Sequence, residues 1–155
     1  MQRLESHFTA TGFVLNKKHD RALVIFHNKL QVWLPAGGHI DAGELPHEAV
    51  VREVFEETGV TGVVVDASKN LNLDQTTEEQ LPAPIFVLHE LIPAHKGKPE
   101  HKHYDFLYFL IAQDEDLKPA LGEVAHAKWV TQDELELLKT TQATLKIYRD
   151  LLLKK

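Results

Sequence analysis

The chain has 155 residues, which suits one domain with a single hydrophobic core. Its hydrophobic content of 43% and charged content of 26% are those of a globular protein, so extensive disorder is excluded. The formal net charge of -6 argues against a general grip on nucleic-acid phosphates, and the lack of cysteine excludes disulfides, thiolate catalysis and cysteine-ligated zinc.

The sequence contains no targeting or membrane signal that we recognise. Its start, MQRLESHFTA, lacks the apolar run of a signal peptide, and no segment is apolar for long enough to span a bilayer. There is also no internal repeat and no linker that would divide the chain. We therefore expect a cytoplasmic protein with no membrane partner, folded as one domain over residues 1–155.

The first part of the chain is rich in β-forming residues and leads into a helix. Strands are predicted for 7–16 and 21–28, joined by a hairpin turn, and for 31–35. Residues 36–45 are predicted to form a loop, because their glycines and aspartate favour turns. A helix is predicted from Pro46 to Thr58, since proline suits a first helical turn and Gly59 suits the position after the end.

The second part alternates between strands and polar segments and ends in helices. Further strands are predicted for 60–67, 85–94, 103–113 and 125–131, the second and third of them paired. Thr131 and Glu134 have capping-box spacing for a helix to about Lys139, and residues 143–155 form an amphipathic helix. This order predicts an α/β (α+β) sandwich, with a mixed β-sheet between α-helices.

Three glutamates crowd one face of the predicted helix. Glu53, Glu56 and Glu57 are three and four residues apart, so their repelling charges share that face. Arg52 can pair with Glu56 along the helix, and a hard divalent ion such as Mg2+ can bind the remaining carboxylates. Taken alone, the cluster is equally consistent with a solvated acidic surface.

The preceding loop adds the rest of a pattern. Residues 38–60 resemble the Nudix box, Gly-x5-Glu-x7-Arg-Glu-U-x-Glu-Glu-x-Gly-U with U aliphatic, at every defined position. The matching residues are Gly38, Glu44, Arg52, Glu53, Glu56, Glu57 and Gly59, with Val54 and Val60 at the aliphatic positions. The order of strands around the box and the C-terminal helix also resemble the Nudix (MutT-like) hydrolase fold.

This resemblance implies a metal-dependent enzyme. Nudix proteins are mostly hydrolases of nucleoside diphosphates linked to another group, and they use Mg2+ or Mn2+. Glu53, Glu56 and Glu57 would then be metal ligands, with a backbone carbonyl of Gly37 completing the site. Arg52 would hold a glutamate in place by a charge-assisted bond, and Glu44 would brace the loop or assist the metal shell.

The resemblance leaves the general base open between two glutamates. Glu53 is a reasonable choice within the box. Glu123 precedes Trp129 by six residues and resembles the auxiliary metal-binding or base position of several Nudix hydrolases, although a surface glutamate would look the same.

Outside the box, two groups of side chains are candidates for substrate binding. His101, His103 and Asp105 alternate along a predicted strand, so they face one way. They could bind a metal, contact substrate phosphates or form an ordinary polar sheet face. Trp33, just upstream of the glycine loop, is the preferred aromatic for stacking on a nucleobase, although most strand aromatics belong to a core.

The substrate is predicted by elimination. Nudix enzymes of the ADP-ribose and diadenosine-polyphosphate types carry a proline or tyrosine fifteen to eighteen residues after the final glycine of the box, here Gly59, and residues 74–77 contain neither. A nucleoside triphosphate or a nucleotide sugar therefore remains, with no stable nucleic-acid partner and a possible homodimer. The alternative is a non-catalytic nucleotide sensor, although such domains usually lose box glutamates. A Nudix-type isomerase would need a catalytic cysteine, which the chain lacks.

Overall fold

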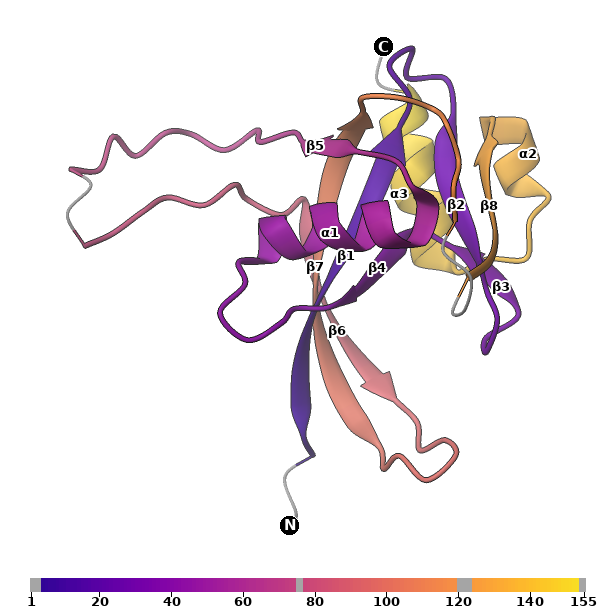
Figure 1. The fold of residues 1–155 in the computed structure, drawn as a ribbon, viewed down its shortest axis with the longest axis horizontal. Helices are drawn as coiled ribbons and strands as arrows, with labels where there is room; N and C mark the ends of the chain where they lie inside the picture. Colours follow the sequence, from indigo (N-terminus) through magenta and orange to yellow (C-terminus); the bar gives the residue numbers. More distant parts are fainter. Residues whose placement is uncertain (1–3, 75–76, 120–123, 154–155) are drawn as a thin grey trace.

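A computed structural model describes residues 4–74, 77–119 and 124–153 (Figure 1). The described elements, in chain order, are β1 (Ser6–Leu15), β2 (Ala22–His27), β3 (Val32–Leu34), β4 (Ala36–His39), α1 (Pro46–Thr58), β5 (Gly62–Val64), β6 (Phe86–Ile92), β7 (His101–Ala112), β8 (Val124–Val130), α2 (Gln132–Glu136) and α3 (Gln142–Leu153). Among the described helices, none combines the length and the apolar character that crossing a membrane requires.

The two longest strands, β1 and β7, form the centre of one mixed sheet. They run parallel, with Ser6 opposite Lys102 and Leu15 opposite Ile111. On its other side β1 pairs antiparallel with β4 along its middle and with β2 at its end. β7 pairs antiparallel first with β6 and then with β5, while β2 continues to β3 and β8. The predicted pairing of the strands now labelled β6 and β7 is confirmed.

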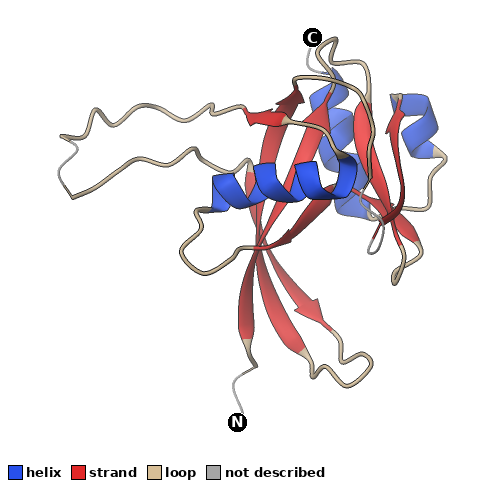
Figure 2. Cartoon of the chain, in the orientation of Figure 1, coloured by secondary structure: helices blue, strands red, loops and turns tan. Residues whose placement is uncertain are grey.

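Helices cover both faces of this sheet. Val50 and Val54 of α1 are fully buried against Leu110 of β7 on one face. Ile147 and Leu152 of α3 pack with a second apolar cluster on the opposite face. Figure 2 shows the sheet in red between these two helices. The predicted sandwich of helices around a mixed sheet is confirmed.

Local signals placed both ends of α1 and the start of α2, although α2 ends at Glu136 and not near Lys139 as predicted. α1 begins at Pro46 and ends at Thr58, as predicted, and Gly59 follows with a φ of 78°, a conformation that glycine adopts without strain. The capping box at α2 is also present, because Glu134 N–H donates to the hydroxyl of Thr131 and Thr131 N–H donates to the carboxylate of Glu134. The structure describes the last helix as Gln142–Leu153.

Two predictions from local composition were wrong. Ala36–His39 was predicted to be loop, but it is strand β4, paired with β1 from Thr9 to Gly12. Glycine is needed there for close approach, because a Cβ on Gly37 would lie 2.6 Å from the carbonyl oxygen of Ala10. The predicted strand 60–67 is shortened to Gly62–Val64. In both places tertiary pairing outweighs local propensity.

The α3 face depends on one buried hydroxyl. The side chain of Tyr148 is fully buried, its hydroxyl donates to the carbonyl of Leu23, and it accepts the N–H of Val14 at 3.2 Å. Tyr148→Phe leaves both backbone groups without this partner, so we expect it to lower the free energy of unfolding by about 2 kcal/mol in urea denaturation. Tyr104→Phe makes the same change at a half-buried tyrosine and should cost at most about 0.5 kcal/mol. Equal effects of the two changes would contradict this account.

Candidate active site

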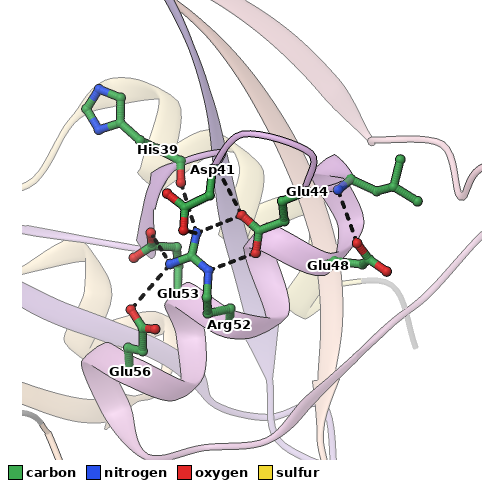
Figure 3. Close-up of polar contacts among 8 residues, drawn as sticks. His39, Asp41, Glu44, Glu48, Arg52, Glu53 and Glu56 are labelled. Carbon is green, nitrogen blue, oxygen red and sulfur yellow. Dashed lines mark hydrogen bonds and ion pairs between the residues drawn. The ribbon is translucent and has the colours of Figure 1, made fainter.

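The box residues surround one guanidinium group between the end of β4 and the exposed side of α1. Figure 3 shows Arg52 at the centre, with carboxylates from the loop and from the helix pointing toward it. Arg52 holds Glu44 with two parallel bonds, from Nε to Oε1 at 2.8 Å and from Nη2 to Oε2 at 2.9 Å. Glu44 also accepts the N–H of Asp41 at 3.0 Å, so it links the loop to the helix.

The same guanidinium contacts two of the three helix glutamates. Arg52 Nη1 donates to Glu53 Oε1 at 2.7 Å and to Glu56 Oε2 at 3.3 Å. Its Nη2 also donates to the backbone carbonyl of His39 at 3.0 Å, at the end of β4. The i,i+4 pair of Arg52 with Glu56 that the spacing suggested is therefore present, as one of several contacts.

The pKa values of Arg52 and its carboxylate partners are shifted by their surroundings. The bonds from Arg52 hold the pKa of Glu44 below its usual value. Burial raises the pKa of Glu53, although Arg52 opposes the shift. The carboxylates in turn raise the pKa of Arg52, so it stays charged. One positive charge therefore faces Glu44, Glu53 and Glu56, and the cluster keeps a net negative charge.

The two glycines of β4 let the backbone approach the helix glutamates. Gly37 N–H donates to Glu57 Oε2 at 2.9 Å, which fixes the third glutamate against the strand. A Cβ on Gly38 would lie 2.6 Å from the carboxyl carbon of Glu53, so a larger residue there would displace this carboxylate. Strand β4 and helix α1 are thus in contact through backbone and carboxylates.

This donor set suits a hard divalent cation. Glu53, Glu56 and Glu57 offer carboxylate oxygens, the ligands that Mg2+ and Mn2+ prefer, beside a glycine backbone that leaves room. The carboxylates also carry more negative charge than the single guanidinium neutralises. A bound cation would reduce the repulsion between them. The residues present therefore fit the metal site that the box pattern implies.

Of the other predicted site residues, one lies outside the described residues and one lies in a different part of the sheet. Glu123 lies outside the described residues, so its role stays a prediction. Trp33 is in β3, where its ring contacts Phe26 at a centroid distance of 5.3 Å and Lys128 Nζ lies 4.2 Å from its ring centroid. Trp33 also packs against the α3-side apolar cluster, so part of its surface is already used.

His101, His103 and Asp105 do share a face of β7, as predicted, but they have different environments. Asp105 is buried, and its carboxylate accepts bonds from Thr9 at 2.9 Å and from Thr11 at 2.8 Å. Burial raises the pKa of Asp105. Burial and neighbouring histidines lower the pKa of His103 to about 4. Asp105 is therefore held by β1, whereas His103 belongs to a group of histidines.

Sequence reasoning missed the residues that the parallel pairing of β1 and β7 supplies. His7 lies opposite His103, and Thr9 lies opposite Asp105. The alternation of His7, Thr9 and Thr11 along the first predicted strand was visible, but the partner strand was not. The role of the Gly37 N–H was also missed, because every residue except proline has a backbone N–H and the sequence does not show which one binds a side chain.

Comparisons with known proteins agree with this geometry. A family model described as the NUDIX domain matches residues 6–151. Among curated proteins, the m7GpppN-mRNA hydrolase NUDT17 of Xenopus laevis is 47% identical over 47 residues. That match covers 30% of this chain and only 15% of the relative's length.

Solved structures share the fold over nearly the whole chain. A NUDIX-family hydrolase from Clostridium perfringens superposes with a TM-score of 0.79 at 29% identity, covering 94% of this chain and 95% of that one. The dihydroneopterin triphosphate pyrophosphohydrolase of E. coli superposes with a TM-score of 0.65 at 12% identity, covering 99% and 100% respectively. The second likeness concerns the fold alone.

The role of Arg52 in holding the loop can be tested by removing its charge. Arg52→Gln leaves half-buried carboxylates facing one another without a guanidinium, so we expect the free energy of unfolding to fall by about 2 kcal/mol with chelator present. Urea denaturation measures this change.

Arg149→Gln is the matched control. Arg149 pairs with Glu136 at 2.6 Å on the surface, where an ion pair contributes at most about 1 kcal/mol. If the two variants lose the same stability, the loop does not depend on Arg52.

Proposed function

This chain belongs to the NUDIX family, as an enzyme of the Nudix hydrolase type, and on that premise we propose that it hydrolyses a nucleoside diphosphate linked to another group. The reaction would depend on Mg2+ or Mn2+. The observation that carries the proposal is the convergence of the box carboxylates on the Gly37–Gly38 backbone around Arg52.

We assign the box residues complementary parts in this reaction. Glu53, Glu56 and Glu57 would hold the divalent ion together with the carbonyl of Gly37. Arg52 would position the glutamates, and Glu44 would brace the loop, as its bonds to Arg52 and Asp41 suggest. The ion would neutralise the charge on the diphosphate oxygens.

The bond that breaks is a phosphoanhydride. Water attacks one phosphorus of the bridge, the bond from that phosphorus to the bridging oxygen breaks, and the other phosphate leaves with that oxygen. A carboxylate accepts the proton of the attacking water. Within the box we assign this part to Glu53, whose carboxylate lies against the Gly38 backbone beside the other helix glutamates. Glu123 is the alternative base. We expect no covalent intermediate, since the chain has no thiol and no evident nucleophilic motif.

For the substrate, we propose a nucleoside triphosphate or a nucleotide sugar, acted on in the cytoplasm by a monomer or homodimer. The Xenopus laevis relative is a hydrolase of m7GpppN-mRNA, a substrate that contains a phosphate chain. Trp33, His103 and Asp105 stay predicted substrate contacts. The second candidate function is a nucleotide sensor without turnover, and the complete set of box glutamates argues against it.

A substrate panel tests the reaction, and one substitution tests the site. We expect turnover of at least one member of a panel of nucleoside triphosphates, nucleotide sugars, dinucleotides and capped RNA in Mg2+ or Mn2+. Glu57→Gln keeps an acceptor for the Gly37 N–H but loses the charge, so turnover should fall by about a hundredfold or more, because charge stabilisation by the ion contributes several kcal/mol. Phosphate release, followed by chromatography of the products, measures both.

Glu136→Gln makes the same change on α2 and should leave turnover unchanged. Circular dichroism should show that both variants keep the fold. Nucleotide binding without turnover across the whole panel would favour the sensor, and full turnover by Glu57→Gln would remove Glu57 from the proposed site.

A further inference from the structure

Histidines gather where β1 and β7 begin and β4 ends, on the sheet face opposite α1. His7, at the start of β1, lies opposite His103 in the parallel register, and His101 is two residues earlier on β7. The ring centroids of His7 and His101 are 4.8 Å apart, and those of His101 and His103 are 5.0 Å apart. His39 of β4 is adjacent, with its Nε2 3.3 Å from His7 Nδ1. In Figure 1 this region is the lower part of β1 and β7, below α1.

Three of these rings each offer one ligand atom to a common point. Ligand nitrogens of His7, His101 and His103 all lie within 4.8 Å of one another. The group combines a His-x-His pair on one strand with a histidine on its parallel neighbour. Side chains on one face of adjacent paired strands converge in this way, so the arrangement follows from the register.

His101 and His103 each keep one ring nitrogen without a hydrogen bond among the described residues. His101 Nδ1 is 3.0 Å from the carbonyl of Pro99, which can only accept, so Nδ1 carries the proton and Nε2 keeps its lone pair. His103 Nε2 is buried and has no hydrogen-bond partner among the described residues, while its Nδ1 lies 3.9 Å from the carboxylate of Glu90. Carbonyl and carboxylate groups behind the rings are the usual outer partners of metal-binding histidines.

An ordinary polar sheet face does not explain this arrangement. A buried ring nitrogen without a partner costs free energy, and a polar surface would leave it in contact with water. Nor does Asp105 supply the missing partner, because Thr9 and Thr11 hold its carboxylate. A cation among the rings would satisfy His103 Nε2.

We propose that His7, His101 and His103 bind a divalent transition-metal ion such as Zn2+, at a site separate from the box carboxylates. Neutral imidazoles prefer Zn2+, Ni2+ and Co2+ to Mg2+, which prefers oxygen. Tetrahedral Zn–N bonds of about 2.0–2.1 Å place two nitrogens roughly 3.4 Å apart, so the rings need only move closer together. To bind the ion, His7 would give up one of its two present contacts, with Glu5 or with His39.

An ion at this site cross-links the first residues of β1 to those of β7. Those ends project beyond the two helices that cover the rest of the sheet (Figure 1). The site also touches the box, because the ring of His39 contacts His7 while its carbonyl accepts a bond from Arg52. The site therefore adds stability where the sheet is least covered.

Titration with Co2+, which reports nitrogen coordination by its visible absorption, tests the proposal. The full chain carrying Glu56→Gln and Glu57→Gln is used with Mg2+ in excess, so that binding at the box does not contribute. We expect one equivalent of Co2+ to bind, Zn2+ to displace it and the thermal midpoint to rise. His7→Gln and His101→Gln should each weaken binding by roughly a hundredfold, since each removes a ligand.

His89→Gln is the control, because this exposed histidine of β6 faces the other side of the sheet beside Tyr104. It should bind Co2+ like the parent chain. Circular dichroism shows whether each variant folds. Because two histidine positions are substituted, the test still holds if one of the variants fails to fold. Absence of Co2+ and Zn2+ uptake, or uptake that both ligand substitutions leave unchanged, would overturn the site.

Discussion

One guanidinium allows the loop before α1 and the glutamates on it to occupy the same small volume. Arg52 uses separate edges of its planar group for separate partners: Nε and Nη2 for Glu44, and Nη1 for Glu53 and Glu56. A lysine has a single ammonium group and could not hold a carboxylate with two parallel bonds while also reaching the others. Because the carboxylates still outnumber this charge, the site that Arg52 organises is also one that a divalent cation would stabilise.

The apolar positions of the motif explain how the glutamates come to lie on the β4 side of α1. Val54 and Val60, at its two aliphatic positions, are fully buried, and Thr58 is buried beside them. Val54 and Thr58 fix the rotation of α1 on the sheet, and Val60 packs just beyond its end, so that Glu53, Glu56 and Glu57 lie on the side where β4 passes. The pattern therefore combines two requirements, one for packing and one for chemistry, on two faces of one short segment.

The sequence predicted what depends on neighbouring residues and missed what depends on distant ones. The limits of α1, the capping box at Thr131 and the grouping of the box glutamates all follow from spacings of a few residues. The strand Ala36–His39 did not, because its glycines suggest a turn until β1 is placed beside them. His7 is ninety-six residues from His103, and only the parallel register of β1 and β7 brings the two together. For the same reason Asp105 looked available, although Thr9 and Thr11 hold it.

The two candidate ion sites differ in the one property that governs which ion each would hold. The box offers carboxylate oxygens and a glycine backbone, whereas the β1–β7 end offers ring nitrogens, so hard and borderline ions would separate between them by donor type. His39 lies at the boundary, with its carbonyl bonded to Arg52 and its ring against His7. A change in the position of β4 at His39 would move both sets of contacts. The short strand that local composition failed to predict is therefore the element through which the two sites would influence each other.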